Sequence, residues 1–395
     1  MGLGDCRESR SAGSLDSKAN HWNVERDSFV YHQQQQRKDC QPTQVDDTRS
    51  RSCAELGWKM LKTKLLTLAV FLASMPTASA AQPEAPIIEE WTVPWENSRP
   101  RDPYVDSAGL VWFVGQRSHY IASLNPENGS FRQLVLDPGT GPHNLIIDGD
   151  HTIWYAGNLR MHIGRMDTAT GAIHKVVMPD ETARDPHTLV FDDAGDIWFT
   201  VQGGNFVGKL TVANDQVDLF PVPTPRARPY GINIAGDGTV WVAEFGTNKL
   251  LKIDPATYEL TEIELPETAS RPRRLEVTSD GMIWYVDYAE GQLGRLNPES
   301  GEITQWPMPG GKVSRPYGME VDADNRLWIV ETGPTPNQFV GFDPRSESFF
   351  GRTPIPSGGG SVRHMHYDAA TNVIWFGTDT NTIGRATLPG VSDGK

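Results

Sequence analysis

The sequence predicts an all-β fold, a single seven-bladed β-propeller, and three observations lead to it. A unit of 42 to 47 residues, measured between successive tryptophans, occurs seven times. A proline stands twelve residues before each of the first six tryptophans, and Arg363 holds the seventh position. Each unit contains four short alternating segments, and repeats of this length and content are typical of propeller blades. The repeated residues are Trp112, Trp154, Trp198, Trp241, Trp284, Trp328 and Trp375.

The expected strands of one blade are clearest in residues 228–266. Pro229 has no backbone N–H to give to a ladder, so the first strand begins directly after it. Asp237-Gly238 favours a tight turn into the strand that carries Trp241. Asp254-Pro255 marks a later turn between strands. The strands expected in this unit are 230–235, 240–244, 249–253 and 259–265.

The last unit lacks a fourth strand after residues 383–388. Residues 87–94, ahead of the first unit, have the pattern of the fourth strand elsewhere, for example residues 303–309. We therefore expect the N-terminal strand to complete the seventh blade and close the ring, because this removes a free sheet edge.

The first eighty residues lie outside the repeats. Two lysines precede an almost entirely apolar run at residues 65–75, and Ala78-Ser79-Ala80 follows. The run is too short to span a bilayer as a helix, and this order is typical of a secretory signal peptide. We interpret residues 60–80 as that peptide, cleaved after Ala80, and residues 81–395 as one propeller domain of a periplasmic or secreted protein.

Residues 1–59 are polar, include four consecutive glutamines and have no apolar period, so we do not expect them to fold alone. A signal peptide belongs at the start of a chain. We therefore interpret residues 1–59 as a disordered or mis-assigned extension ahead of the true start at Met60. The alternative is a cytoplasmic tail before an uncleaved anchor.

The positions of the cysteines and the net charge exclude several kinds of site and of binding partner. All three cysteines precede the expected cleavage site, which excludes a disulfide framework, a thiolate zinc site or a cysteine nucleophile from the mature chain. Residues 81–395 contain 25 Lys and Arg against 41 Asp and Glu, a net charge of −16. Such a charge repels nucleic acid and anionic lipid. We expect a monomer that binds a small molecule, with no nucleic acid partner and no membrane association after cleavage.

Two sets of variable residues are expected on one face of the ring near its axis, at the start of the first strand and the end of the second strand of each blade. They include the residue types that move protons or hold metals. The alternative is a structural role, in which these side chains only satisfy backbone hydrogen-bonding groups or bind water. One set follows the proline position: Arg101, His143, His187, Tyr230, Arg273, Tyr317 and His364. The other lies three residues after each tryptophan: Gly115, Gly157, Val201, Glu244, Asp287, Glu331 and Thr378.

Three further histidines, His151, His162 and His174, lie off both sets, in turn or outer-strand positions. Polar side chains in such positions are usually solvated. We expect all three at the surface.

The repeated pattern of Arg-Pro-Tyr-Gly-Ile, Gly-x-Val-Trp and Ile-Gly-Arg-Leu-Asn-Pro resembles the virginiamycin B lyase (streptogramin lyase) family over about residues 87–389. The resemblance implies a propeller enzyme that opens a cyclic depsipeptide by elimination. In that family a histidine removes a proton beside the ester carbonyl, and Mg²⁺ held by glutamate stabilises the enolate. The resemblance therefore implies a carbon–oxygen lyase with Mg²⁺ as cofactor.

The family's Arg-Pro-His, Glu-Pro-His and Pro-Tyr-Gly motifs are matched here by Gly141-Pro142-His143, Asp185-Pro186-His187 and Pro229-Tyr230-Gly231. By this match His187 is the base and His143 a substrate-positioning or electrophilic partner. Asp185 would hold the metal, with Glu244 from the next blade. The substrate-binding residues would be Tyr230, Arg273, Tyr317, His364 and Arg101. In plain chain order the family's positions fall instead on Tyr317, Val362 and His364.

Two other readings stay open. A non-catalytic propeller would use Arg101, Arg273 and Arg274 to bind an anionic ligand or a protein, since guanidinium groups pair with carboxylates or phosphates in a bidentate way. A calcium-dependent lactonase of the gluconolactonase kind would need converging oxygen ligands. Its ligands would come from Asn144, Glu244, Asp287 and Glu331.

Overall fold

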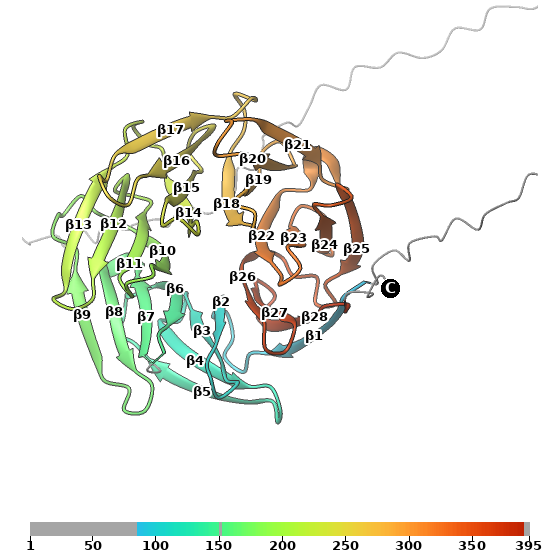
Figure 1. The fold of residues 1–395 in the computed structure, drawn as a ribbon. Coiled ribbons are helices and arrows are strands. Elements are labelled where there is room, and N and C mark those ends of the chain that lie inside the picture. The colour runs from blue at the N-terminus through green and yellow to red at the C-terminus, as the bar shows by residue number, and fades with distance from the viewer. Residues whose placement is uncertain (1–84, 150–151, 391–395) are drawn as a thin grey trace, which may run out of the picture. The chain divides into compact units, whose positions relative to one another are not determined.

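The computed structural model describes residues 85–149 and 152–390, which form seven four-stranded antiparallel sheets around one axis (Figure 1). The predicted all-β seven-bladed propeller is therefore confirmed. The helices in this part of the chain are two 3₁₀ turns, η1 (Asn158–Arg160) and η2 (Gly311–Val313). Neither has the length and apolar character that crossing a membrane requires. The extension and signal peptide expected in residues 1–80 lie outside the described residues.

The first strand of each blade lies innermost, and the second strand pairs with its outer edge (Figure 1). The innermost strands are β2 (Pro100–Val105), β6 (Pro142–Ile147), β10 (Pro186–Phe191), β14 (Pro229–Ile234), β18 (Pro272–Val277), β22 (Pro316–Val321) and β26 (Val362–Asp368). The second strands are β3 (Val111–Gly115), β7 (Thr152–Gly157), β11 (Ile197–Val201), β15 (Val240–Glu244), β19 (Ile283–Asp287), β23 (Leu327–Glu331) and β27 (Val373–Thr378).

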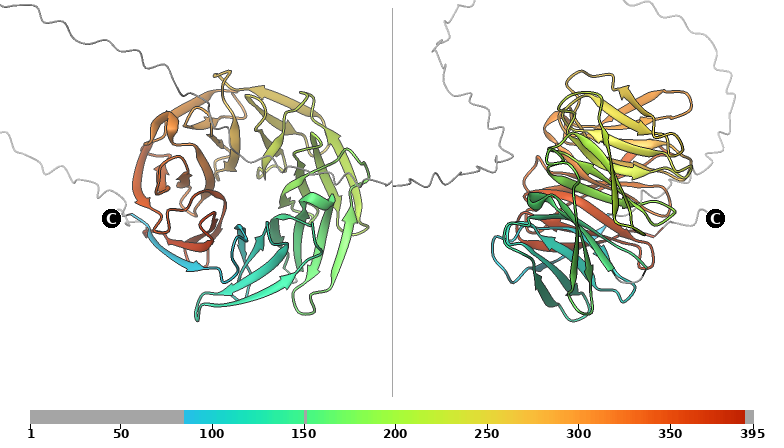
Figure 2. Two further views of the ribbon diagram at one scale, coloured as in Figure 1. Left: turned by 180° about the vertical axis from the view of Figure 1, so that it is seen from behind. Right: turned by 90° about the vertical axis from the view of Figure 1, so that its left-hand side faces the viewer.

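The third and fourth strands complete each blade towards the outside of the ring, which Figure 2 shows from behind and edge-on. The third strands are β4 (Tyr120–Asn125), β8 (His162–Asp167), β12 (Phe206–Thr211), β16 (Lys249–Ile253), β20 (Gln292–Leu296), β24 (Gln338–Asp343) and β28 (Thr382–Thr387). The fourth strands are β5 (Ser130–Val135), β9 (Ile173–Val177), β13 (Gln216–Pro221), β17 (Leu260–Glu264), β21 (Ile303–Pro307), β25 (Ser348–Pro354) and β1 (Ile87–Thr92).

The ring is closed by β1, which pairs antiparallel with β28 from Ile87 opposite Thr387 to Thr92 opposite Thr382. The side chain of Asn381 adds two donated hydrogen bonds, to the carbonyls of Val93 and Trp95, each 3.0 Å long. The outer edge of β28 is therefore paired rather than free. This confirms the prediction that the N-terminal strand completes the seventh blade.

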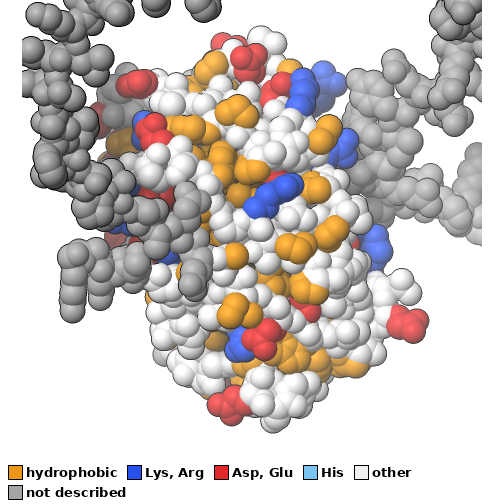
Figure 3. Space-filling model, turned by 90° about the vertical axis from the view of Figure 1, so that its right-hand side faces the viewer, with side chains coloured by type: hydrophobic (Ala, Val, Ile, Leu, Met, Phe, Trp, Pro, Cys, Tyr) orange, Lys and Arg blue, Asp and Glu red, His pale blue; other side chains and the backbone are white. Residues whose placement is uncertain are grey.

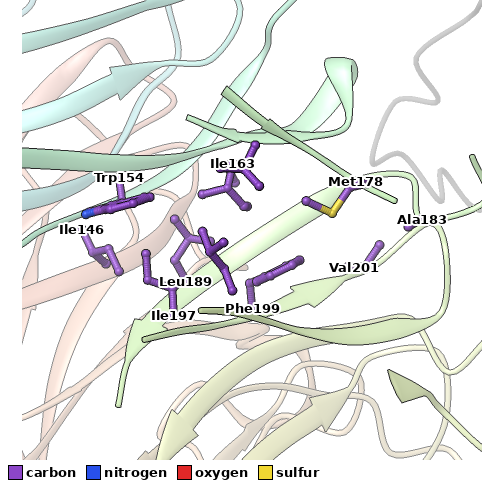
Figure 4. Close-up of a cluster of buried hydrophobic side chains, with 12 residues drawn as sticks. Ile146, Trp154, Ile163, Met178, Ala183, Leu189, Ile197, Phe199 and Val201 are labelled. Carbon is purple, nitrogen blue, oxygen red and sulfur yellow. The ribbon is translucent and has the colours of Figure 1, made fainter. Parts of the chain in front are cut away.

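The repeated tryptophans are buried between neighbouring blades, with at most 3% of their surface exposed. Trp154 and Ile146 of the second blade belong to one hydrophobic cluster with Leu189, Ile197 and Phe199 of the third (Figure 4). Large aromatic side chains remove the most apolar area from water, so these clusters hold adjacent blades together.

The indole N–H of several repeated tryptophans is satisfied by a polar residue six positions earlier. Trp112 donates to Asp106 Oδ2 at 2.7 Å, and Trp328 donates to Asp322 Oδ2 at 2.8 Å. A buried indole donor without a partner would cost stability. The pair of turn residue and tryptophan is therefore part of the blade scaffold and belongs to the fold, not to the site.

Pairing between the first and second strands is irregular just after the proline position in all seven blades. In β18 the shift falls between Pro272 and Arg274. An extra residue in a strand breaks the strict alternation of side chains and re-aims them. Both residues after the proline position can therefore contribute side chains near the axis.

His151, His162 and His174 were expected at the surface. This prediction was wrong for His162, which is only 2% exposed. The opposite residue on β7 is Gly157, and a Cβ there would lie 2.3 Å from the His162 ring, so the glycine makes room for it. His174 lies at the surface as expected, where it contacts Asp215 at 2.8 Å. His151 lies outside the described residues.

The outer surface of the described residues carries side chains of mixed kinds. Hydrophobic, acidic and basic groups are interspersed on the face shown in Figure 3. The most exposed apolar side chains, Ile87, Val135 and Val313, come from β1, β5 and η2. Scattered apolar groups are ordinary on protein surfaces.

Candidate functional site

Polar side chains from the starts of the innermost strands form one connected group around the ring axis, which we call the axial cluster. Nearly all of them are buried, although they are charged or polar. All seven members of the first predicted set belong to it, so the fold brings these residues together. The axial cluster comprises Arg101, Asp102, His143, Asn144, His187, Thr188, Tyr230, Arg273, Arg274, Tyr317, Arg363 and His364.

Two histidines of adjacent blades lie against each other in the axial cluster. The ring centroids of His143 and His187 are 3.6 Å apart, and that of His187 is 4.0 Å from Tyr230. His187 Nδ1 lies 2.8 Å from Thr188 Oγ1, which orients the ring. Burial lowers the pKa of both histidines well below 6.5, with a further lowering led by Arg101 for His143 and by Arg274 for His187. Both imidazoles are therefore neutral near pH 7.

Arg273 is enclosed by aromatic rings. Its guanidinium carbon lies 3.6 Å from the Tyr317 ring centroid, 4.3 Å from Phe245 and 4.5 Å from Tyr288. Such rings attract a cation through their faces, most strongly where water is excluded. The side chain is only 5% exposed, and within residues 85–149 and 152–390 no carboxylate forms an ion pair with it.

The hydroxyl groups of Tyr230 and Tyr317 contact each other. Burial raises the pKa of Tyr230, but Arg273, Arg101 and Arg274 outweigh burial and hold that pKa below its usual value. For Tyr317 burial dominates, and its pKa is raised. Tyr230 is therefore the more acidic phenol of the pair and the better proton donor.

Arg274 crosses the axis and connects four blades. Its Nε donates to the Arg363 carbonyl at 3.0 Å and its Nη1 donates to Thr188 Oγ1 at 3.1 Å. Its Nη2 lies 4.0 Å from Asp102 Oδ2. Because Thr188 also contacts His187, Arg274 is coupled to the orientation of the histidine pair.

Asp102 is the one carboxylate of the axial cluster. It accepts hydrogen bonds from Arg101 Nε at 3.0 Å and from Asn144 Nδ2 at 3.1 Å. Burial raises the pKa of Asp102, but Arg101 outweighs it and the pKa is lowered, so this group is ionised. Burial and then Arg274 lower the pKa of nearby His364 to about 3.

Positive charge predominates in the axial cluster. It holds four guanidinium groups against Asp102, and Arg363 is paired with Asp379 from β27's connecting loop at 2.8 Å. Among the residues that the structure describes, the buried Nη2 of Arg101, Nε of Arg273 and Nη2 of Arg274 have no hydrogen-bond partner. Buried ionic donors are normally paired, so these atoms are poised for an anionic group.

The residues expected to hold Mg²⁺ do not join the axial cluster as a ligand set. Asp185 accepts from Asn158 and faces the Gln202 amide at 3.1 Å. Glu244 accepts from Thr247 at 2.7 Å, on the side of β15 that packs against the third blade. Burial raises the pKa of each carboxyl to about 7.

In the described part of the chain, no group of three or more His, Cys, Asp or Glu side chains is positioned to hold a metal ion. The neighbouring guanidinium groups also repel a divalent cation. The axial cluster therefore does not fit Mg²⁺. The Mg²⁺ site predicted at Asp185 and Glu244 is the alternative to stabilisation by the guanidinium groups of the axial cluster.

The other acidic members of the second set serve the connections between blades. Asp287 Oδ1 accepts from the Arg271 backbone N–H at 3.0 Å. Glu331 accepts from the Gly310 backbone N–H at 2.5 Å and from Arg352 Nε at 3.1 Å. These contacts satisfy backbone donors and do not assemble the oxygen ligands expected for a calcium-dependent lactonase.

Asp102 and Thr188 are members of the axial cluster that sequence reasoning missed. They occupy the second position after the proline, together with Asn144 and Arg274. Strict strand alternation would point these side chains away from the axis, but the strand irregularity changes that. Four of the seven residues at this position are polar, whereas the other three are Gly231, Gly318 and Met365. The position varies, but alternation alone does not direct it to the axis.

A half-buried pair of carboxyl groups lies further along the inner strands. Asn233 Nδ2 donates to Glu276 Oε2 at 2.7 Å. Burial raises the pKa of Glu276 to about 8. Burial and Glu276 together raise the pKa of Glu320 well above 4.5. Glu276 therefore keeps its proton in the folded state at a pH where the unfolded chain has lost it.

Replacing Glu276 with glutamine should flatten the dependence of stability on pH. The raised pKa of Glu276 contributes stability that is complete below the ordinary value of 4.5 and is lost as pH rises towards 8, by up to about 1.4 kcal/mol per pH unit. Glutamine stays neutral and can still accept from Asn233. Urea unfolding at pH 5 and pH 8 measures the effect, with exposed Glu299→Gln as control. Parallel curves for wild type and Glu276→Gln would contradict the assignment.

Comparison with known proteins agrees with this architecture. Residues 79–335 match the Virginiamycin B lyase family. A virginiamycin B lyase of Nocardia farcinica is 30% identical over 104 residues, which are 26% of this chain and 34% of that relative. The chain thus matches about a third of the length of this curated relative.

Solved structures cover more of the chain. A virginiamycin B lyase from Staphylococcus aureus has a TM-score of 0.70 and 24% identity, covering 77% of this chain and 99% of that one. A catalytically inactive form from the same organism, solved with quinupristin, has a TM-score of 0.70 and 25% identity. The extracellular domain of a Bacteroides thetaiotaomicron two-component system has a TM-score of 0.59 at 16% identity, covering 77% and 43% of the two chains. At such identity the last likeness concerns the fold alone.

Proposed function

Because this chain belongs to the virginiamycin B lyase family, we propose that it is a carbon–oxygen lyase that opens a cyclic ester or depsipeptide lactone by elimination. The reaction would take place at the axial cluster. The observation that carries the proposal is the close contact between the tilted rings of His143 and His187, beside the guanidinium groups of Arg273 and Arg274.

His187 is the base of the proposed reaction. Its Nδ1 is held by Thr188 at 2.8 Å, and when Nδ1 donates that hydrogen, Nε2 is left with a free lone pair. Nε2 takes the proton from a carbon that lies beside a carbonyl group and is bonded to the carbon carrying the ester oxygen. The C–H electron pair forms a carbon–carbon double bond, and the bond from the next carbon to the ester oxygen breaks. His143 lies against His187 and positions it or the substrate.

Stabilisation of the enolate is assigned to guanidinium groups. Negative charge develops on the carbonyl oxygen as the proton leaves, and preorganised donors in a water-poor site stabilise such charge strongly. Arg273 and Arg274 both lie over the Tyr230 ring, at 5.0 Å and 5.3 Å from its centroid. Both are at most 5% exposed. In this family member they would replace the charge that Mg²⁺ supplies when bound.

The test is to incubate the protein with quinupristin, the compound present with the S. aureus relative, and to analyse the product. Elimination creates a new double bond, detected by ultraviolet absorbance, and leaves the mass unchanged. Lactone hydrolysis instead adds the mass of one water. Opening with unchanged mass supports the proposal, and addition of water contradicts it.

A second candidate function is binding without catalysis. The unpaired guanidinium donors of the axial cluster favour it, because a bound anion would satisfy them equally well in a sensor. The B. thetaiotaomicron neighbour is an extracellular domain of a two-component system. Saturable ligand binding with no product of any kind would favour this function over the lyase.

Export is proposed with the function. The signal peptide expected at residues 60–80 and the extracellular origin of the B. thetaiotaomicron neighbour support a periplasmic or secreted protein. Fractionation of cells that produce the full chain tests this. Loss of about residues 1–80 and recovery outside the cytoplasm are expected, whereas full-length protein in the cytoplasm would contradict export.

A further inference from the structure

The buried arginines of the axial cluster lack the counter-ions that buried charges normally require. Arg273 is 5% exposed and Arg274 is 3% exposed. Arg274 reaches the Asp102 carboxylate only at 4.0 Å, and Asp102 already accepts from Arg101. Removing an ion from water costs several kcal/mol unless it is paired. The cluster is thus short of negative charge.

The unsatisfied donors belong to neighbouring side chains. Arg273 and Arg274 lie over the same Tyr230 ring, and Arg101 and Arg274 share Asp102. Across the described ranges, one nitrogen of each guanidinium is buried without a hydrogen-bond partner: Arg101 Nη2, Arg273 Nε and Arg274 Nη2. Arg274 thus links the other two residues, to Arg273 through the Tyr230 ring and to Arg101 through Asp102, and each of the three has a cationic donor that an anion could satisfy.

We propose that Arg273, Arg274 and Arg101 form a subsite that binds a carboxylate group, and that the substrate of the enzyme is therefore a carboxylic acid. The planar fork of a guanidinium matches the two oxygens of a carboxylate. Tyr230, Tyr317 and Tyr288 cover the faces of Arg273, so its edge is the side available to a planar partner. The assignment of the substrate as a carboxylic acid rests on the elimination proposed above. Binding of a carboxylate at the subsite does not depend on that reaction.

Residues of the axial cluster can supply each proton transfer that elimination from such a substrate requires. The substrate would be a carboxylic acid that carries an oxygen substituent on its β-carbon. Its acidic hydrogen is then on the α-carbon, between the carboxylate carbon and the β-carbon. Guanidinium groups on the carboxylate stabilise the dianion that forms when His187 removes this hydrogen. The electron pair forms the double bond, the carbon–oxygen bond breaks, and Tyr230 protonates the departing oxygen. When that oxygen is the ester oxygen of a lactone, the product is one ring-opened unsaturated acid that carries the released carboxyl group, and the proton on His187 returns to Tyr230 through solvent.

The test is a binding measurement that needs no turnover. Thermal unfolding and calorimetry are followed with acetate as the probe, against chloride and sulfate at matched ionic strength. We expect acetate to raise the Tm and to bind saturably, and to do so more strongly than sulfate. An equal effect of all three anions would overturn the proposal. A preference for sulfate would overturn the carboxylate assignment.

Arg273→Met keeps the length of the side chain and removes its charge, and it should weaken acetate binding at least about tenfold. Arg295→Met is the matched control, because Arg295 also stacks on aromatic rings, 5.5 Å from Trp284, but lies on outer strand β20. It should bind acetate like wild type. Arg273→Lys retains the charge without the fork, so it should also bind weakly and serves if the methionine variant does not fold. Unchanged binding in the folded Arg273 variant would overturn the proposal.

This experiment separates the two proposals. His187→Ala should retain acetate binding while it loses elimination of a β-acyloxy carboxylic acid. If acetate binds but no such acid is eliminated by wild type, the subsite stands and the lyase function fails. If quinupristin is opened by elimination but acetate does not bind, the lyase function stands and the carboxylate subsite fails.

Discussion

Replacing His187 with alanine is expected to lower kcat/KM for elimination roughly 10²- to 10⁴-fold, the usual contribution of a positioned general base. His187 is 1% exposed and its Nδ1 is held by Thr188 at 2.8 Å. Among the described residues, Nδ1 of the adjacent His143 has no hydrogen-bond partner, so His143 lacks the contact that orients His187 as the base. The assay follows the new double bond spectroscopically under saturating and limiting substrate.

The control is His174→Ala, which removes an exposed histidine that contacts Asp215 on the outer surface. It should leave both kcat and KM unchanged. Thermal unfolding must show that the His187→Ala protein is folded. A folded His187→Ala protein with wild-type kcat would remove His187 from the proposed mechanism.

Replacing Trp154 with alanine should destabilise the propeller by about 3–5 kcal/mol, the usual loss for a buried aromatic side chain. Trp154 is 0% exposed and lies in the hydrophobic cluster between the second and third blades (Figure 4). Truncation leaves a cavity beside Ile146 and Leu189 and also removes the hydrogen bond to Asp148, which is 3.0 Å long. Equilibrium urea unfolding measures the loss.

Trp154→Phe separates packing from the lost hydrogen bond, because phenylalanine keeps an aromatic ring and removes only the indole N–H with part of the volume. We expect a smaller loss of stability from this variant than from Trp154→Ala. A Trp154→Ala protein within about 1 kcal/mol of wild type would show that inter-blade packing at this site does not support the ring.

The fold was predictable from sequence because its signals repeat. Trp241, Pro229 and the turn at Asp237-Gly238 recur in related form around the chain, so each blade supports the assignment of the others. The strands at 240–244 and 249–253 have the predicted bounds. Closure by β1 was predictable since the seventh unit lacked one strand. The outcome shows why repeated patterns are stronger evidence than single segments.

The site was predictable in part. The residue after each proline was recognised because it varies on a constant scaffold, and these positions do meet at the axis. Asp102 and Thr188 were missed because the local irregularity of the inner strands cannot be read from alternation. The directions of Asp185 and Glu244 depend on their partners Asn158 and Thr247, which no spacing rule supplies.

A crystal structure of the protein grown with acetate and Mn²⁺, a metal visible by its anomalous signal and able to occupy oxygen-ligand sites of Mg²⁺, tests the central claim most directly. The account predicts acetate in contact with Arg273 and Arg274, beside the His143 and His187 rings, and no manganese at Asp185. Manganese bound by Asp185, with the arginine subsite lacking acetate, would contradict it and restore metal-assisted elimination.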